Sequence, residues 1–296
     1  MVSPVVDIQN LSKFYGKVTG IKDVTFSIGE GEIFGFIGPN GAGKSTTIRI
    51  LLNLLFPSGG CARVMGFDVV SESKKIRAVT GYIPSDANAY PNMTVAEFLA
   101  YSGRFYGVGN VDERRKELTA VFELDPERRI SDLSLGNRRK VSIIQALQHR
   151  PGLLIMDEPT TGLDPLIQSR FFDLLREENR RGMTIFFSSH ILSEIQLLCG
   201  RVAIIREGLI VNLENIDTLR RKQLKKITVW PANTATDKKS LIPAGTGETV
   251  TITEDSLSFM YADDINILLK KLSSAELLNL TVEEPSLEEI FMHYYK

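Results

Sequence analysis

The segment Gly38-Pro39-Asn40-Gly41-Ala42-Gly43-Lys44-Ser45-Thr46 has the spacing G-x-x-x-x-G-K-[ST] that is typical of a phosphate-binding loop. A short apolar run at 33–37 precedes it, and the apolar residues of 48–55 that follow it have helical spacing. A strand, a glycine-rich loop and a helix in this order are the context in which such a match indicates a P-loop. The segment therefore predicts an α/β core that binds a phosphorylated ligand.

The residue types in this loop explain why it would bind phosphate. Glycine at 38, 41 and 43 lets the backbone turn tightly and approach a phosphate closely. Successive N–H groups then point into the concavity, and the following helix adds about half a positive charge at its N-terminus. Lys44 supplies a charge for the terminal phosphates, and the hydroxyl of Ser45 is placed for Mg²⁺. The alternative, a glycine-rich turn before an ordinary helix, leaves Lys44 and Ser45 unexplained.

Composition limits the classes of protein to which the chain can belong. Its 296 residues, 43% of them hydrophobic, suffice for one large domain and a smaller one. The net charge of −1 argues against a dedicated nucleic-acid binder, which needs a clustered positive surface. The basic runs at 138–140 and 220–222 are interpreted as solvated faces.

Neither the cysteines nor the hydropathy pattern indicates a secreted or membrane-spanning chain. Cys61 and Cys199 lie far apart and lack metal-ligand spacing, which favours reduced thiols in the cytosol. No N-terminal signal pattern is found, and no apolar run reaches the ~18 residues of a membrane span. Any membrane role would therefore depend on a partner chain.

Two acidic residues follow a predicted buried strand. The run at 153–156 is apolar throughout, which is typical of a strand covered on both faces, and Asp157 and Glu158 come directly after it. Ligands collect at the carboxyl ends of parallel strands. Asp157 is therefore a candidate ligand of Mg²⁺, and Glu158 a candidate general base for an attacking water. Without a P-loop in the chain, two surface acids at a strand end would be the better interpretation.

A second predicted strand, at 184–188, ends in polar residues that include His190. A lone histidine is more often structural than functional. Here, however, it would lie at the edge of the sheet where the terminal phosphate is expected. As a cation or donor, His190 would stabilise the charge that develops on a transferring phosphoryl group.

Together these motifs resemble the ATP-binding subunits of ABC transporters over about residues 5–212. The resemblance identifies 38–46 as the Walker A loop that binds ATP and 153–157 as Walker B. It implies Lys44, Glu158 and His190 as the catalytic residues, with His190 as the switch histidine.

Further nucleotide contacts follow from the same resemblance. Residues 161–164 look like the D-loop, which makes Asp164 a candidate contact. Tyr15 falls where the family places an aromatic ring that stacks on adenine. Phe14 competes for that role, and a position in the core is the alternative for Tyr15.

The family's signature motif, Leu-Ser-Gly-Gly-Gln, resembles Leu133-Ser134-Leu135-Gly136-Asn137 at the start of an amphipathic helix. A serine and a glycine at a helix N-terminus can bind an anion through backbone amides. The resemblance implies that Ser134 and Gly136 contact the terminal phosphate held by an opposite subunit. ATP would then be sandwiched between two chains, and dimerisation would depend on nucleotide.

Two positions depart from the family pattern. In the signature, Leu135 and Asn137 replace a glycine and a glutamine, and Ser85 stands where the glutamine of the Q-loop is expected. Serine is too short to reach a metal and a water as glutamine does, so a bridging water or Asp86 would take part. Ser85 is thus a third candidate metal ligand after Ser45 and Asp157. We expect hydrolysis to survive with altered coupling to a transporter partner.

The sequence predicts three regions. The first, 1–214, is an ABC-type P-loop NTPase domain with a β-rich subdomain and a helical subdomain at about 86–150. The second, 215–225, is a charged linker. In the family the helical subdomain receives the permease, and four aromatic residues are candidates either for that groove or for the subdomain's own core: Tyr90, Phe98, Tyr101 and Tyr106.

The third region, 226–296, is predicted to be a small accessory α+β domain. Its element order β-α-β-β-α-β suggests a ferredoxin-like fold, with a weak helix at 236–242 and a capped final helix at 286–295. The segment 284–291 looks like the tail of drug- and ion-export ABC subunits. Dimer stabilisation or regulation is the expected use, and a passive structural appendage is the alternative.

The resemblance implies an ATP-binding and ATP-hydrolysing subunit that drives export through a separate membrane permease by ATP-dependent dimerisation. The implied cofactors are ATP and Mg²⁺, and the implied partners are the permease and a second ATP-binding subunit, as a homodimer, with no nucleic acid. The implied location is cytoplasmic, peripheral on the inner face of the cell membrane.

Two alternatives stay open at this point. The first is a cassette that binds ATP with weak or no turnover and acts as a regulatory or soluble non-transport module. Ser85 and Asn137 favour this alternative, and the intact Lys44, Asp157 and Glu158 oppose it. A soluble ABC ATPase that acts on ribosomes or DNA generally carries two cassettes or a long coiled-coil insertion, and this sequence has neither.

Overall fold

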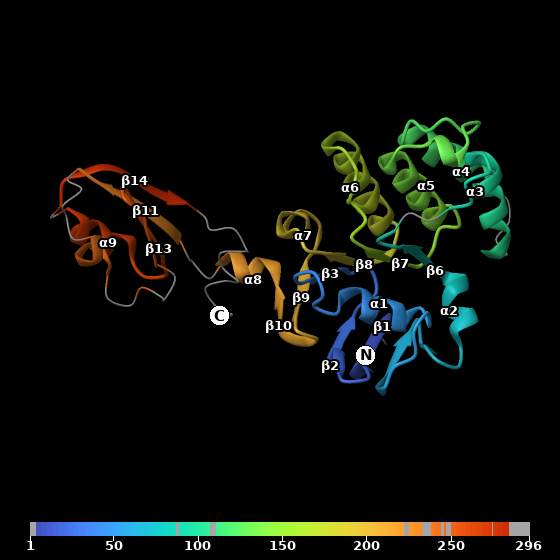
Figure 1. The fold of residues 1–296 in the computed structure, drawn as a ribbon, viewed down its shortest axis with the longest axis horizontal. Coiled ribbons are helices and arrows are strands. Elements are labelled where there is room, and N and C mark those ends of the chain that lie inside the picture. Colours follow the sequence, from blue (N-terminus) through green and yellow to red (C-terminus); the bar gives the residue numbers. More distant parts are fainter. Residues whose placement is uncertain are drawn as a thin grey trace. The chain divides into compact units, whose positions relative to one another are not determined.

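The computed structural model describes residues 4–86, 89–106, 111–221, 225–232, 238–243, 246, 250–273 and 275–283. The chain divides into two compact units, Met1–Leu213 and Glu214–Lys296 (Figure 1). Each unit has a hydrophobic core of its own. None of the helices in the described ranges is long and apolar enough to cross a bilayer.

A six-stranded sheet forms the centre of the first unit. Its order is β10-β9-β3-β8-β7-β6, and β6, β7, β8, β3 and β9 run parallel. The strands are β3 (Ile33–Ile37), β6 (Thr80–Ile83), β7 (Leu153–Asp157), β8 (Thr184–Ser189), β9 (Arg201–Arg206) and β10 (Leu209–Asn215). Every residue of β7 and β8 is buried, as their uninterrupted apolar runs predict. The α/β fold is therefore confirmed, and the carboxyl ends of β3, β7 and β8 lie at one edge of the sheet.

A second, antiparallel sheet packs against this centre. It has the order β2-β1-β4-β5 and consists of β1 (Val6–Tyr15), β2 (Val18–Ile28), β4 (Gly59–Val64) and β5 (Phe67–Asp68). Phenylalanine rings fill the space between the two sheets: Phe26 lies 5.2 Å from Phe34 and 5.9 Å from Phe186 between ring centroids. Helix α1 (Lys44–Leu51) buries Ile48, Ile50 and Leu51 in the same core.

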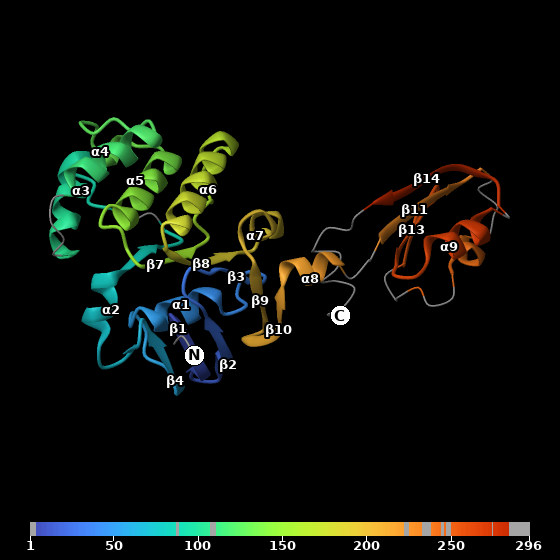
Figure 2. The ribbon, with the colours of Figure 1, turned by 180° about the vertical axis from the view of Figure 1, so that it is seen from behind.

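The remaining helices of this unit are α2 (Ser73–Val79), α3 (Val95–Gly103), α4 (Asp112–Val121), α5 (Leu135–Leu147), α6 (Pro165–Arg180) and α7 (Leu192–Leu198), with 3₁₀ turns η1 (Arg104–Tyr106) and η2 (Ile130–Asp132). Figures 1 and 2 show α3, α4 and α5 gathered at one end of the unit, with the central strands between them and the antiparallel sheet. A capping box, in which Thr94 and Glu97 each accept from the other's backbone N–H, begins α3. Helices α3, α4 and α5 lie between β6 and β7 in the chain, in the region for which a helical subdomain is predicted.

The four candidate groove aromatics separate by burial. Phe98 is buried in the helical subdomain, whereas Tyr90 is exposed. The ring of Tyr101 lies edge-on between Tyr90 and Phe105, with centroids 5.7 and 5.2 Å away. Tyr106 stacks on His149 instead, with ring centroids 3.6 Å apart. Only part of this set is therefore available to a partner.

The second unit is an antiparallel sheet with helices. Its strands, in the order β12-β13-β11-β14, are β11 (Lys225–Pro231), β12 (Val250–Ile252), β13 (Leu257–Tyr261) and β14 (Leu277–Glu283). Helix α8 (Ile216–Arg221) precedes the sheet, and α9 (Ile265–Leu272) buries Leu268 and Leu272 in its core. The described part of the weak helix at 236–242 is a 3₁₀ turn, η3 (Lys238–Leu241), and the predicted helix at 286–295 lies outside the described residues.

Candidate functional site

Three glycines shape the loop between β3 and α1, each for a different reason. A Cβ on Gly38 would lie 2.2 Å from the carbonyl oxygen of Ile205, so the neighbouring strand β9 leaves no room for a side chain. Gly41 has open space around it but a φ of +81°. Gly43 combines a φ of +110° with a Cβ position only 2.8 Å from the oxygen of Gly20. The loop geometry therefore requires the glycines that the motif contains.

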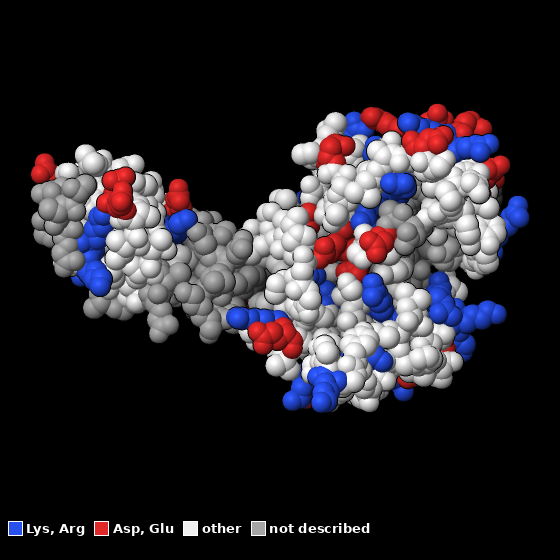
Figure 3. Space-filling view, in the orientation of Figure 1, with Lys and Arg blue, Asp and Glu red and all other residues white. Residues whose placement is uncertain are grey.

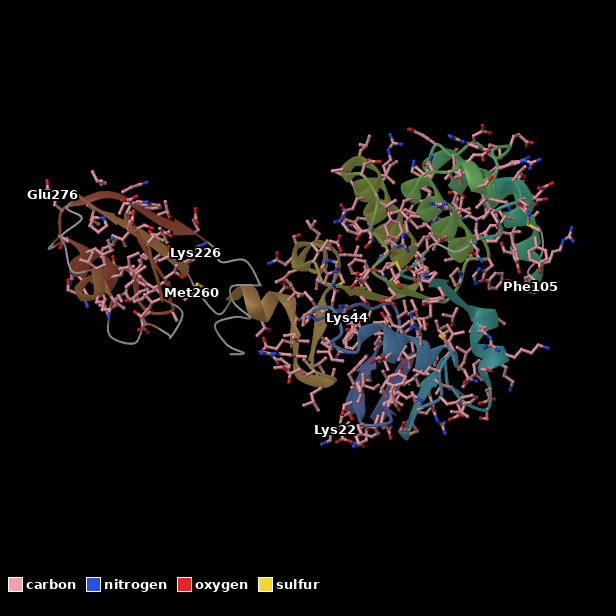
Figure 4. The ribbon with its side chains drawn as sticks, viewed as in Figure 1. Lys22, Lys44, Phe105, Lys226, Met260 and Glu276 are labelled. Atoms are coloured by element: carbon pink, nitrogen blue, oxygen red, sulfur yellow. The ribbon has the colours of Figure 1, made fainter. Side chains whose placement is uncertain are left out.

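Lys44 is the first residue of α1, and its ammonium group points back over the loop. It is 5% exposed, and its Nζ donates to the carbonyl oxygens of Gly38 at 2.7 Å and Pro39 at 3.1 Å. The same Nζ lies 3.4 Å from Oε1 of Glu158. Figure 4 labels Lys44 in the first unit, beside the central strands. The structure thus brings the P-loop lysine to the acidic end of β7.

Glu158 stands between two basic groups. Its Oε1 faces Lys44, and its Oε2 lies 3.1 Å from Nδ1 of His190, whose side chain is 42% exposed. The backbone of Glu158 is in the left-handed region, with φ of +49°, and its N–H donates to the oxygen of Ser188 at 3.0 Å. Figure 3 shows acidic and basic side chains meeting near the middle of this unit's face. All three predicted catalytic residues therefore converge.

Asp157 is fully buried at the end of β7. In the sheet register it pairs with Ser188 of β8, whose Oγ donates to Oδ1 of Asp157 at 3.0 Å. Its other carboxylate oxygen, Oδ2, has no hydrogen-bond partner in the described part of the chain. A buried carboxylate oxygen without a donor is costly, and a bound cation would satisfy it. Ser45, half-buried in the first turn of α1, is the neighbour of Lys44.

The tyrosine next to this carboxylate on the sheet is not a candidate base. Burial and, to a smaller extent, the negative charge of Asp157 raise the pKa of the Tyr82 phenol to about 12. Tyr82 therefore keeps its proton at any pH at which the enzyme would work.

A buried carboxylate that the sequence reasoning missed supports the histidine. Glu194 of α7 is 2% exposed; its Oε2 accepts from Oγ of Ser189 at 2.6 Å and its Oε1 from Nε2 of Gln168 at 2.7 Å. Ser189 precedes His190, and Gln168 lies in α6, just after Asp164. Glu194 thus ties the strand end that carries His190 to the helix that begins at the D-loop. The signal available in the sequence was its place four residues after His190.

Tyr15 lies at the end of β1 and is half exposed. Its ring covers Gly20: a Cβ on Gly20 would lie 2.7 Å from Cε2 of Tyr15. Since the oxygen of Gly20 in turn approaches Gly43, this ring stands next to the P-loop. Phe14, also exposed, does not share that contact with Gly20.

The signature residues begin α5. Ser134 is the N-cap, with Oγ accepting from the N–H of Asn137 at 3.3 Å, and it is exposed. Gly136 lies against the D-loop: a Cβ there would be 2.7 Å from the oxygen of Gly162. Asp164 caps α6 by accepting from the N–H of Ile167 at 3.0 Å. Among the described residues, no hydrogen bond or ion pair joins the signature to the P-loop of the same chain.

The basic run at 138–140 is not uniformly solvated, so that interpretation was wrong for Arg139. Its guanidinium is 1% exposed and donates to the backbone oxygens of Pro84, Ser85 and Thr161. Helical spacing carries the signal, because Arg139 shares the stripe of the buried Ile143 and Ala146 at i+4 and i+7. Ser85 is therefore held through its main chain.

Comparison with known proteins agrees with this geometry. A family model described as ABC transporter matches residues 21–161. The linearmycin resistance ATP-binding protein LnrL of Bacillus subtilis (strain 168) is 33% identical over 98% of this chain and 97% of its own. The Nod factor export ATP-binding protein I of Paraburkholderia xenovorans (strain LB400) is 36% identical over 70% of both chains.

Solved structures show the same fold. The ATP-binding subunit of an ABC transporter superimposes with a TM-score of 0.70 at 31% identity, covering 74% of this chain and 92% of its own. A dimeric ATP-binding cassette in a post-hydrolysis state with bound ADP and Pi has a TM-score of 0.66 at 26% identity, covering 71% and 98%.

Proposed function

The chain belongs to the ABC transporter family as the ATP-binding, ATP-hydrolysing subunit of an export transporter, and we propose that it drives export by closing on ATP as a homodimer. The observation that carries this proposal is the position of Glu158 between Lys44 and His190, at 3.4 and 3.1 Å. A positioned water, a base and groups that stabilise the negative charge on the phosphoryl oxygens are what phosphoryl transfer to water needs. One similar solved cassette is a dimer with bound ADP and Pi, and another is part of the ABC transporter complex cbiONQ, which supports a dimer that works within a larger complex.

The loop at 38–46 is proposed to hold the phosphates of ATP. Backbone N–H groups and the N-terminus of α1 attract the anion, and Lys44 moves its contacts from Gly38 and Pro39 to the terminal phosphates. Tyr15 is proposed to stack on adenine, because its exposed ring stands beside the loop.

Mg²⁺ is proposed to bind between Asp157 and Ser45. The unpartnered Oδ2 of Asp157 fits this assignment. In the described parts of the chain, no group of three His, Cys, Asp or Glu side chains forms a metal site. This fits Mg²⁺, which commonly takes one or two protein ligands together with phosphate oxygens and water. When bound, the cation neutralises phosphate charge. Ser188 orients Asp157 for this task.

Glu158 is proposed to take the proton of the attacking water. General-base catalysis of this kind contributes about 10²- to 10⁴-fold in rate. Lys44 and His190 contact different oxygens of the Glu158 carboxylate and so set its direction. His190, which is partly exposed, would then stabilise charge on the phosphoryl group.

The second half of the site is proposed to come from another copy of the chain. Ser134 and Gly136 lie at the exposed start of α5, and Asp164 begins α6 beside them across the contact between Gly136 and Gly162. An exposed helix start with free amides is suited to a phosphate presented by a partner. ATP would bridge two copies, and hydrolysis would remove the bridge.

The permease is proposed to dock at the groove between α2, β6 and η1, which places the protein at the inner face of the cell membrane. The groove has a volume of about 540 Å³ and combines an apolar lining with two basic residues: Leu52, Leu54, Tyr82, Phe105, Lys74 and Arg77. Pro84 also lines it, so a partner seated there would lie beside Ser85.

We propose that coupling to transport differs here because Ser85 replaces a glutamine. A Ser85→Gln variant with unchanged ATPase rate and export would contradict this.

The domain boundaries are proposed at 1–214, 215–225 and 226–296. The division into units at Leu213 and Glu214 supports the first boundary.

The strand order β14-β11-β13-β12, with α9 between β13 and β14, supports a ferredoxin-like arrangement of the second unit with η3 in place of its first helix. Dimer stabilisation or regulation is its proposed role.

Substitution of Glu158→Gln tests the proposed function. The variant loses the base but keeps a side chain of the same size, so we expect ATP turnover to fall by about 10²- to 10⁴-fold and ATP to trap a dimer. Light scattering with ATP and Mg²⁺ measures the dimer, and phosphate release measures turnover.

The matched control is Glu113→Gln, which removes an exposed carboxylate on α4. It should hydrolyse ATP like the parent and remain monomeric after turnover. A parent without turnover even beside its permease would favour the alternative of a cassette that only binds ATP. A Glu158→Gln protein that stays monomeric with saturating ATP would contradict the dimer.

A further inference from the structure

Arg139 is a large charged side chain in an unusual position. It is 1% exposed, whereas Arg138 and Lys140 beside it on α5 are only half-buried. Of the residues that the structure describes, none offers it a carboxylate within ion-pair distance. A cation buried in this way lowers stability unless its donors are satisfied.

The donors of Arg139 are satisfied by main-chain oxygens from two separate loops. NH1 and NH2 donate to Pro84 and Ser85, and Nε lies 3.4 Å from the oxygen of Thr161. Pro84 and Ser85 follow β6, while Thr161 follows β7, and these two strands are neighbours in the sheet. One planar group therefore joins the loops at the carboxyl ends of adjacent strands, which its rigid fork of donors allows.

The loop after β7 is the one that carries Glu158. The N–H of Thr161 lies 3.4 Å from the oxygen of Glu158, and Glu158 itself has the left-handed backbone conformation. Helix α5 touches this loop a second time, where Gly136 meets Gly162. The position of the loop thus depends on α5 at two points.

The charge of Arg139 also acts on the site. Burial lowers the pKa of its guanidinium, and the carboxylates of Asp86, Asp157 and Glu158 oppose that effect. Among the described residues, Arg139 is held by carbonyl oxygens and not by a carboxylate, which is unusual for a cation buried near the catalytic acids, and such exceptions concentrate at functional sites.

We propose that Arg139 is a positioning residue for ATP hydrolysis, whose guanidinium clamps the Pro84–Ser85 loop and the Thr161 loop to α5 and so sets the direction of Glu158. The proposal rests on the role of Glu158 as general base. Because Ser134 and Gly136 stand at the start of α5, a displacement of α5 on phosphate contact would also displace the loop that holds Glu158. In this chain Arg139 is linked to position 85 through the main-chain oxygen of Ser85 and not through a side-chain amide.

Kinetics of Arg139→Gln, Arg139→Lys and the control Arg138→Gln test the positioning role. We expect kcat of Arg139→Gln to fall between about 10- and 100-fold, because a small displacement of a catalytic group costs that much. The Kd for ATP should stay within about twofold, because the P-loop is untouched. Arg139→Lys should also be slow, since one ammonium cannot span three carbonyls. Arg138→Gln should match the parent.

A double variant separates positioning from loss of fold. In a Glu158→Gln background, Arg139→Gln should leave the residual rate unchanged, because the group it positions is already absent. If the two losses multiply instead, or if Kd for ATP weakens along with kcat in Arg139→Gln, the proposal is wrong. Full activity of Arg139→Gln would overturn it as well.

Hydrogen exchange tests the clamp without any need for turnover. In the full-length protein without nucleotide, Arg139→Gln should speed amide exchange in 160–163 and at Ser85, and Arg138→Gln should not. Exchange in Arg139→Gln that matches the parent in both segments would contradict the proposed clamp. A parent that fails to hydrolyse ATP would contradict the proposed function alone, because this measurement would still decide for or against the clamp.

Discussion

Asp157 and Glu158 are neighbours in sequence with opposite surroundings. Asp157 is fully buried and oriented by Ser188 of the adjacent strand, whereas Glu158 turns out of the strand with a positive φ and meets Lys44 and His190. The end of β7 thus separates a carboxylate suited to a metal from one suited to a base. The left-handed backbone of Glu158 turns the chain out of β7, which makes this division possible.

His149 provides a prediction about pH at the scale of one residue. Burial lowers the pKa of His149 to about 4, below its ordinary value of 6.5, and its ring stacks on Tyr106. Between these values the unfolded chain binds more protons than the folded one, so stability rises with pH. The contribution of His149 is complete above pH 6.5 and is lost as the pH falls toward 4.

We expect the first unit to lose about 2 kcal/mol of stability from this histidine between pH 7.5 and pH 5. Urea denaturation of the parent and of His149→Phe measures it, because the variant keeps an aromatic ring but cannot titrate. The difference in unfolding free energy between the two proteins should change over this pH range. Parallel pH dependences would refute the prediction.

At the scale of secondary structure, α6 is joined to the helical subdomain by a buried ion pair. Arg114 of α4 is 4% exposed, and its NH2 lies 2.7 Å from Oε1 of Glu178 on α6. Arg181 contacts the same oxygen at 2.8 Å, and Glu117 contacts Arg114 from the exposed side. Because Asp164 caps the other end of α6, this pair fixes the helix that follows the D-loop.

Substitution of Glu178→Gln should destabilise the first unit by about 3 kcal/mol, because the buried guanidinium of Arg114 loses its buried carboxylate and keeps only the exposed Glu117. The control is Glu177→Gln on the same helix, whose pair with Arg181 is half exposed. Its loss should be less than about 1 kcal/mol. Denaturant titration measures both, and equal losses would show that burial of the pair does not matter.

At the scale of the whole molecule, the chain contains two units with separate cores. The P-loop, the acids and His190 all belong to the first unit. A ligand stabilises the unit that binds it by RT ln(1 + [L]/Kd), which grows with the logarithm of the ligand concentration. Two-state unfolding is not expected for such a chain.

Calorimetry should therefore show two unfolding transitions. Saturating ATP with Mg²⁺ should raise the midpoint of one, by about 2.7 kcal/mol of stabilisation at 100 times Kd, and leave the other in place. Lys44→Ala is the control and should abolish the shift. A single transition that moves as a whole would contradict the independence of the two units.

Much of the first unit was predictable because its signals are local. The glycine loop, the apolar runs of β7 and β8 and the acids behind them each occupy a few consecutive residues. The predicted helical region at about 86–150 divides into α3, α4 and α5, with 3₁₀ turns after α3 and before α5.

The order of residues along the chain was enough to identify the family and to predict the phosphate loop and the two carboxylates, because each depends on backbone shape and chemistry within one strand–loop–helix unit. It could not establish which main-chain oxygens Arg139 contacts, that Ser188 orients Asp157, or that Glu194 supports the strand end of His190. Those contacts join residues 22 to 55 positions apart, or neighbours across a turn, and they arise only when parallel strands bring their carboxyl ends to one edge.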